Sequence, residues 1–122
     1  MNGIEYLADT NAVIYLLSGN DCMKPFLQKK LAVSVISFME LLFFPSITDK
    51  EEKTIRHFLD KCDILPIDEL TREKTILVRK KQKVKLPDAI IAATAMTRDL
   101  SLITADTGFF KLEGLQVEKL EP

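Results

Sequence analysis

The chain has 122 residues and fits one domain, because two ordinary hydrophobic cores do not fit in this length. Apolar residues make up 47% of it and charged residues 29%, a balance that excludes an intrinsically disordered chain. No apolar run approaches the roughly 20 residues of a transmembrane helix, and the N-terminus lacks a signal-peptide pattern. Cys22 and Cys62 stand outside any CxxC motif. We therefore expect a soluble cytoplasmic domain spanning residues 1–122, with free thiols and no membrane partner.

The net charge of −1 gives no support for nucleic-acid binding, but the charge is unevenly distributed. From Arg72 to Lys85 the chain carries seven basic residues and one acidic residue, so this segment holds +6 and the remaining 108 residues hold −7. A basic stripe of this kind can meet a phosphate backbone or an acidic partner. The commoner alternative is a solvated helix face, and the sequence leaves both interpretations open.

Strands and helices are predicted to alternate along the first third of the chain. The expected elements are a strand at 4–8, a helix at 12–17 capped by Asn11, a short helix at 21–30, a strand at 31–36, and a helix from Ser37 to Phe44 that Pro45 ends. Both strands are apolar, and the second is β-branched, which favours burial on both faces. Asn11 and Ser37 are residue types that cap helix N-termini.

The same alternation continues to the end of the chain. An amphipathic helix beginning near Thr48 is indicated by apolar residues at positions 55, 58, 59 and 62. The further expected elements are a strand at 63–67, a basic helix at 69–83, an Ala-rich helix at 88–98 with Pro87 in its first turn, a strand at 101–105, a turn at 106–108 and an edge strand at 116–120. Apolar strands separated by helices predict an α/β fold, with a mostly parallel sheet covered on both faces.

Four acidic residues are expected at one edge of this sheet. Asp9 and Asp106 each end a predicted strand, Glu40 lies one turn into a helix, and Asp88 begins the Ala-rich helix. Ligands of parallel sheets bind at the carboxyl ends of the strands, where such residues meet. Converging carboxylates repel one another unless a cation neutralises them, and oxygen ligands without His or Cys favour Mg²⁺ or Mn²⁺. A cluster of this kind suits the hydrolysis of phosphodiesters.

Each acid taken alone also has a structural explanation. Glu40 fits the last position of a capping box, Asp88 complements a helix dipole, and Asp106 heads a turn. Asp9 is the hardest to explain in this way, because Asn11 already fills the capping role. The joint arrival of all four at one sheet edge favours a functional cluster.

Four segments, in this order, carry a recognisable family pattern: Tyr6–Asn11, Ser34–Leu41, Leu86–Ala95, and Leu102–Asp106 followed by Phe109. The third, an Asp followed by a helix of small residues, is the most specific. The pattern resembles the PIN-domain family of metal-dependent ribonucleases, and most closely the VapC-type toxins of prokaryotic toxin–antitoxin systems. The resemblance implies a three-layer α/β/α sandwich with a central, mostly parallel sheet.

Carried over by position, the resemblance also implies functional roles. The acidic quartet around Mg²⁺ or Mn²⁺ would be Asp9, Glu40, Asp88 and Asp106. The first and third would be the principal metal ligands, and the other two would hold a second metal or orient water. The hydrogen-bonding groups that aim these carboxylates would be Thr10, Asn11 and Thr104. The implied activity is cleavage of single-stranded RNA, by a homodimer that a cognate antitoxin neutralises.

Three other functions remain open on the residues alone. A non-catalytic PIN-like module for RNA or protein contact would be marked by the loss of an acid, whereas the quartet is intact. A phosphotransfer receiver domain would need adjacent acids beside Asp9. A phosphatase of the haloacid dehalogenase type would need an acid where Asn11 stands.

The lone histidine and the phenylalanines are expected to be structural. His57 should lie at the surface, because no base-and-nucleophile arrangement accompanies it. Phe38, Phe43 and Phe44 should fill the core or a partner groove, and Phe109 should close the end of the sheet.

Overall fold

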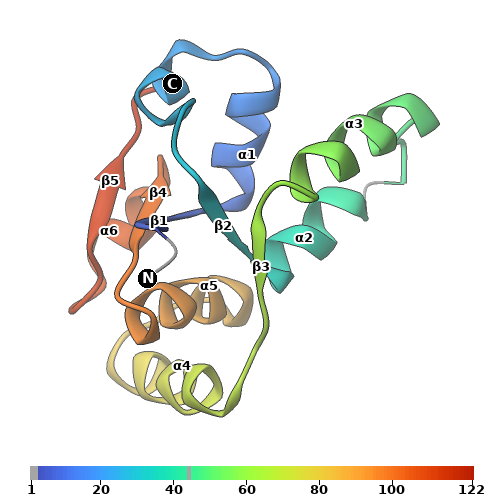
Figure 1. Cartoon of the computed structure of the whole chain (residues 1–122). Helices are drawn as coiled ribbons and strands as arrows, with labels where there is room; N and C mark the ends of the chain where they lie inside the picture. Colours follow the sequence, from blue (N-terminus) through green and yellow to red (C-terminus); the bar gives the residue numbers. More distant parts are fainter. Residues whose placement is uncertain (1–2, 44) are drawn as a thin grey trace.

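Five short strands form the centre of the computed structural model, which describes residues 3–43 and 45–122 (Figure 1). In chain order they are β1 (Tyr6–Ala8), β2 (Leu31–Ser34), β3 (Asp63–Leu65), β4 (Ser101–Thr104) and β5 (Val117–Lys119). They lie in the order β3-β2-β1-β4-β5, and each neighbouring pair is parallel. The predicted α/β fold with a mostly parallel sheet is confirmed, and β5 lies at an edge as expected.

Helical segments connect the strands, as parallel pairing requires. They are α1 (Thr10–Leu17), the 3-10 helix η1 (Asp21–Phe26), α2 (Val35–Leu42), α3 (Asp49–Leu59), α4 (Glu69–Lys81), α5 (Leu86–Thr97) and α6 (Thr107–Phe110). In Figure 1, α4 and α5 lie side by side, while α1 lies across the sheet from them and α3 extends away from it.

The sheet is buried on both faces because successive side chains of a strand point in opposite directions. One core cluster takes Leu7, Ala32 and Leu102 from the central strands and packs them against α5 and α6. The next residue of each strand enters a second cluster with α1, η1, α2 and α3: Ala8, Val33 and Ile103. Two hydrophobic layers around one sheet make the three-layer arrangement that the sequence predicted.

Helices α1, α2 and α5 begin earlier than predicted, and α5 starts at Leu86 instead of residue 88. Asp9, not Asn11, caps α1 by accepting a hydrogen bond of 2.8 Å from a backbone N–H of the first turn, and Asn11 lies inside the helix. Ser34, not Ser37, caps α2, and Ser37 is buried within that helix. The capping box of Ser37 with Glu40 is therefore wrong. Strand β2 ends at Ser34, two residues before the predicted end, whereas β1 ends at Ala8 as predicted.

Several smaller predictions have mixed outcomes. Helix α4 ends at Lys81, two residues before the predicted end, and Phe44 lies outside the described residues. His57 is exposed, as predicted. Phe38 is half-buried against the core, whereas Phe43 is 83% exposed, so of its two predicted positions, the core or a partner groove, the structure excludes the core.

The cysteines and the lengths of the helices are two further features of the fold. Cys22 and Cys62 are free and half-buried. Burial, together with the charge of Asp63, raises the pKa of the Cys62 thiol to about 11, which keeps it protonated at neutral pH. Within residues 3–43 and 45–122, no helix combines the length and the apolar character that crossing a bilayer requires.

Candidate functional site

A polar cavity of about 230 Å³ lies where β1 and β4 end. Its wall is formed by Asp9, Thr10, Asn11, Glu40, Asp88, Ile91, Asp106 and Phe109. These residues come from four separate parts of the chain: the start of α1, helix α2, the start of α5, and the connection from β4 through α6. The structure thus brings the four predicted acids together, along with two of the three predicted hydrogen-bonding residues.

The four carboxylates lie at different depths. Asp9 is only 5% exposed and forms the floor, and Asp88 is half-buried. Glu40 and Asp106 are exposed at the mouth. The exposure of the four carboxylates therefore increases from the floor of the cavity to its mouth, which is open to solvent.

Asp9 is fixed by hydrogen bonds to both of its carboxylate oxygens. Oδ1 accepts from the backbone N–H of Ala12 at 2.8 Å, and Oδ2 accepts from the Thr104 hydroxyl. The Thr104 oxygen in turn accepts from the backbone N–H of Asp106 at 3.0 Å. One buried threonine thus orients Asp9 and anchors the chain at Asp106.

Glu40 is held by the neighbouring helix. The Thr10 hydroxyl donates a hydrogen bond of 2.6 Å to Glu40 Oε1 and lies 2.9 Å from the Ser37 hydroxyl. Sequence reasoning missed this role of Ser37 by assigning it as the cap of α2. Its position three residues before Glu40, on the same helix face, is the signal that was available.

Asp106 has a structural role and a place in the cavity. It caps α6, and its Oδ1 accepts a hydrogen bond of 2.8 Å from the backbone N–H of Gly108. A Cβ at position 108 would lie 3.1 Å from that oxygen, so the absence of a side chain at Gly108 avoids a close contact with the Asp106 carboxylate. The turn expected from the sequence and the acidic cluster are thus compatible.

Burial and mutual repulsion make two of the carboxylates difficult to ionise. Burial raises the pKa of Asp9, and the charges of Asp106 and Asp88 raise it further, against the hydrogen bonds from Thr104 and the Ala12 backbone. The pKa of Asp88 is also raised, first by burial and then by Asp106 and Glu40, while Lys85 lowers it. A positive charge in the cavity would relieve this repulsion.

The donor set fits a hard divalent cation. All four charged side chains offer oxygen, which Mg²⁺ and Mn²⁺ prefer. Among residues 3–43 and 45–122, no three His, Cys, Asp or Glu side chains are already grouped closely enough to enclose an ion. Mg²⁺ usually keeps several waters and takes one or two carboxylates, so an open cavity of this kind is compatible with it.

The apolar part of the cavity consists of Ile91 and Phe109. Ile91 follows Asp88 by three residues and so shares its helix face, a spacing from which it could have been predicted. Phe109 is buried in the core cluster beneath α5 and also borders the cavity. Asn11, which was predicted to hydrogen-bond near the acids, is exposed at the edge of the cavity.

Three solved structures illustrate what the chain is similar to. A toxin–antitoxin complex from Klebsiella pneumoniae contains a chain with 34% identity and a TM-score of 0.80, covering 94% of this chain and 97% of that one. VapBC2 from Rickettsia felis, bound to a DNA fragment from its promoter, has 20% identity, a TM-score of 0.81, and coverages of 97% and 99%. VapBC-1 from nontypeable Haemophilus influenzae has 22% identity, a TM-score of 0.78, and coverages of 95% and 97%.

The sequence itself gives a family match. No curated protein has significant sequence similarity to the chain. The profile of the PIN domain, in contrast, matches residues 6–115, which include all four cavity carboxylates. Together with the five-stranded parallel sheet, this match means that the chain belongs to the PIN domain family.

Proposed function

We propose that this chain is an endoribonuclease that hydrolyses phosphodiester bonds of single-stranded RNA with the help of Mg²⁺ or Mn²⁺. The observation that carries the proposal is the convergence of Asp9, Glu40, Asp88 and Asp106 in one open cavity. The raised pKa values of Asp9 and Asp88 support it, because carboxylates crowded at the cost of repulsion are characteristic of sites that use them.

The carboxylates would have different roles according to how deeply they lie in the cavity. Asp9 and Asp88, the buried and half-buried carboxylates, would hold the cation. A bound divalent cation supplies positive charge to the phosphoryl and leaving oxygens and makes water more acidic. Glu40, oriented by Thr10, and Asp106 at the mouth would position the attacking water or a second ion. Thr104 would keep Asp9 aimed into the cavity.

The competing proposal is a non-catalytic PIN-like module that binds RNA or protein. Such a module has no need to maintain four carboxylates against one another. The raised pKa of Asp88, caused first by burial and then by the charges of Asp106 and Glu40, is therefore an argument for catalysis.

We expect the wild-type protein to cleave single-stranded RNA, to lose this activity in EDTA, and to regain it with Mn²⁺ or Mg²⁺. An Asp9→Asn variant should lose more than about 100-fold in rate, since even residues that only orient metal ligands cost 10–100-fold. Gel analysis of a labelled oligoribonucleotide measures both. Activity that persists in EDTA would contradict the proposal.

Two matched controls separate folding and binding from chemistry. Asp21→Asn changes an exposed carboxylate on η1 and should leave cleavage unchanged. Asp88→Asn should weaken Mn²⁺ binding in calorimetry, while the metal-free fold is retained because repulsion in the cavity is reduced. If Asp88→Asn binds Mn²⁺ as tightly as the wild type, Asp88 is not a ligand of the ion.

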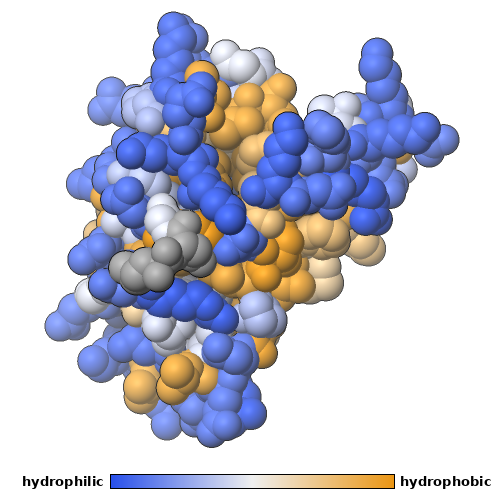
Figure 2. Space-filling view, in the orientation of Figure 1, coloured by the Kyte–Doolittle hydropathy of each residue, from blue (hydrophilic) through white to orange (hydrophobic). Residues whose placement is uncertain are grey.

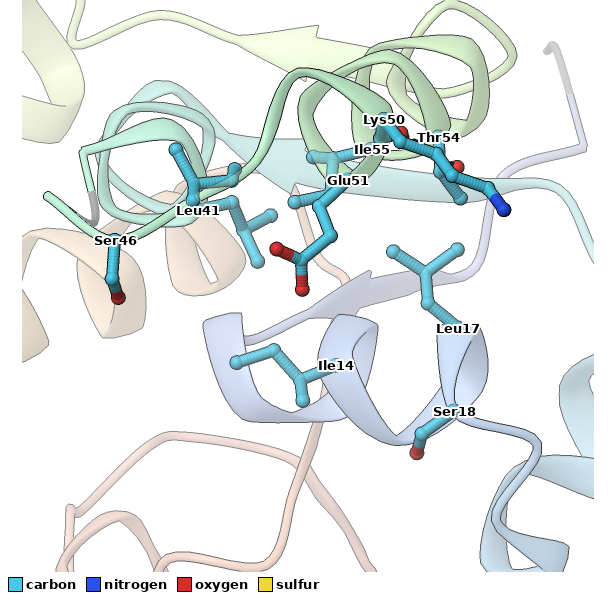
Figure 3. A pocket seen from close by; sticks show the side chains of 10 residues that line it. Ile14, Leu17, Ser18, Leu41, Ser46, Lys50, Glu51, Thr54 and Ile55 are labelled. Carbon is cyan, nitrogen blue, oxygen red and sulfur yellow. Dashed lines mark hydrogen bonds between the residues drawn. The ribbon is translucent and has the colours of Figure 1, made fainter.

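We further propose that the chain is the toxin of a type II pair, which an antitoxin neutralises by seating apolar side chains in a groove between α1 and α3. This groove has a volume of about 490 Å³, and in Figure 3 Ile14 and Leu17 of α1 face Leu41, Glu51 and Ile55 across it. Figure 2 shows hydrophobic surface in this region beside the hydrophilic outer side of α3. The similar chain from Klebsiella pneumoniae was solved in a toxin–antitoxin complex, which supports this assignment.

A homodimer, which the resemblance also implies, belongs to the same proposal. Helix α4 carries Leu70 and Leu77 seven residues apart, 69% and 51% exposed, and a second copy would shield such side chains from water.

A further inference from the structure

The side chain of Gln82 connects two loops that are far apart in the sequence. Its Nε2 donates a hydrogen bond of 2.8 Å to the backbone carbonyl of Lys111, and its Oε1 accepts one of 3.0 Å from the backbone N–H of Glu113. Gln82 is itself the extended residue that ends α4, and its backbone N–H donates to the carbonyl of Val78 at 3.0 Å. The amide group therefore acts as a two-point clamp on residues 111–113.

The clamped segment directly follows α6, the helix that Asp106 caps. Lys111 is the C-terminal cap of α6, and the backbone N–H of Leu112 donates to the carbonyl of Phe109 at 3.2 Å. Since α6 has only four residues, a constraint at its end is also a constraint on Asp106 and Phe109, which line the acidic cavity.

The other side of the clamp leads to Asp88. Residues 82–85 connect α4 to α5, and Arg79 Nε holds this connection by donating a hydrogen bond of 3.2 Å to the carbonyl of Val84. Lys85 then caps α5, whose first turn contains Asp88. Gln82 is thus connected to Asp88 through the backbone of the α4–α5 connection. It is connected to the segment that follows Asp106 through its two side-chain hydrogen bonds.

We propose that Gln82 is a positioning residue that sets the placement of Asp106 relative to Asp88 in the acidic cavity. This inference rests on the proposed metal-binding function for its effect on the ion, but the clamp itself is independent of any ion. Gln82 does not line the cavity, so it acts only through the two loops.

The test compares three variants in Mn²⁺ calorimetry. Gln82→Ala removes both hydrogen bonds and should weaken Mn²⁺ affinity roughly three- to tenfold, the range expected for one or two net hydrogen bonds. Gln82→Glu should weaken it at least as much, because a carboxylate oxygen would then face the Lys111 carbonyl. Gln116→Ala, the matched control, removes an exposed amide that accepts from Ser101 and should leave affinity unchanged.

Repeating the measurement in a protein that already carries Asp106→Asn distinguishes an effect of Gln82 on the position of Asp106 from an effect on the stability of the whole fold. If Gln82 acts through Asp106, Gln82→Ala should change Mn²⁺ affinity by less than about twofold when Asp106→Asn is already present, because coupled residues are not additive. Equal weakening in both backgrounds would overturn the inference.

Amide NMR spectra of the metal-free protein test the clamp without any ion. Gln82→Ala should move the signal of Gly108, whose N–H donates to Asp106, as well as that of Glu113, and Gln116→Ala should move neither. An unmoved Gly108 signal would overturn the inference. Absence of Mn²⁺ binding in the wild type, with the Gly108 signal still moved, would instead refute the proposed function and leave the clamp intact.

Discussion

At the scale of the residue, Asp9 combines two roles that sequence analysis treats as alternatives. Its Oδ1 caps α1, while its Oδ2 is turned toward Thr104 and the carboxylate borders the cavity. The helix cap lowers the pKa of Asp9, but burial outweighs it. The hydrogen bond from the Ala12 N–H to Asp9 therefore partly offsets the free-energy cost of burying the Asp9 charge at the floor of the cavity.

This balance predicts a specific pH dependence for the metal-free protein. The pKa values of Asp9 and Asp88 are raised in the folded state above 3.8, so the folded protein binds more protons than the unfolded chain above that pH. Their contribution to the free energy of unfolding is present below pH 3.8 and is lost as pH rises through the raised folded values. Asp9→Asn should therefore become more stable relative to wild type as pH rises, as measured by urea unfolding.

A control and an added ion complete this test. Asp60→Asn, changed at an exposed carboxylate that ends α3, should not reproduce the trend. Saturating Mn²⁺ should reverse the advantage of Asp9→Asn, since the ion stabilises only the protein that binds it. A stability difference that is independent of pH would contradict the role of burial at Asp9.

Residue identity alone predicted which acids gather but not how they are held. The four acids could be identified because each lies at the end of a predicted strand or in the first turn of a predicted helix. Ser37 and Ser34 could not be distinguished as caps, because both precede apolar helical residues, and only the pairing of Ser34 with Leu65 of β3 decides between them. The exposure of Phe43 likewise depends on tertiary packing that no local pattern encodes.

At the scale of the element, the basic segment contains arginines whose side chains form hydrogen bonds within the fold and lysines whose side chains are exposed. Arg72 pairs with Glu73 at 2.8 Å, and Arg79 is used to hold the α4–α5 connection. Lys81, Lys83 and Lys85 are exposed, and Lys85 is near enough to lower the pKa of Asp88. Part of the basic stripe therefore lies beside the acidic cavity.

We expect this part to bind the RNA backbone. Replacing Lys81, Lys83 and Lys85 by Gln should weaken RNA binding, and every phosphate that is no longer neutralised should flatten the log–log salt dependence by about 0.7. Mn²⁺ affinity should not weaken, because removing Lys85 takes a positive charge away from Asp88. Fluorescence anisotropy with a labelled, uncleavable single strand at several salt concentrations measures the slope.

The matched triple variant changes the same charge elsewhere. Lys24, Lys29 and Lys30 are exposed on or after η1, and their replacement by Gln should leave the slope unchanged. An unchanged slope in the first triple variant would identify the stripe as a solvated face or as the receiver of an acidic antitoxin tail.

Element types were predicted more accurately than element ends. All five strands were located because apolar and β-branched residues set them apart from the helices between them. At least one end of each strand was misplaced by one or two residues, since hydrogen bonding between strands, which the local apolar pattern does not encode, sets these ends. The Arg98 side chain, which joins Asp68 and Thr71 at the start of α4 to the end of α5, shows the same dependence on long-range contacts.

At the scale of the whole molecule, the groove and the acidic cavity share two helices. Helix α1 begins at the cavity with Thr10 and reaches the groove at Ile14, and α2 contributes Glu40 to one and Leu41 to the other. A partner in the groove therefore lies one helical turn from the carboxylates without entering their cavity.

This separation predicts that partner binding and cleavage can be uncoupled. Ile14→Glu, at a side chain 38% exposed, should weaken binding of the proposed antitoxin by at least about tenfold, the effect of a charge in an apolar contact. RNA cleavage by the isolated variant should be retained. Co-purification and calorimetry measure the binding.

The matched control lies on another surface. Ile76→Glu changes an isoleucine of similar exposure, 45%, on α4 and should leave this binding unchanged. Equal weakening in both variants would place the partner elsewhere or indicate that neither variant is folded. Circular dichroism separates these two outcomes.

The hydrogen bond between Asp9 and Thr104 has a consequence for how the protein is made. It joins residues 95 positions apart, across the two central strands β1 and β4. A ribosome releases the N-terminal part of a chain first, at about 5–20 residues per second. Asp9 therefore leaves the ribosome early, and its Oδ2 has no Thr104 hydroxyl to accept from until β4 has been synthesised. A nascent or truncated product that ends before β4 lacks both Thr104 and Asp106, so the acidic cavity is completed only after β4 and the start of α6 have been synthesised.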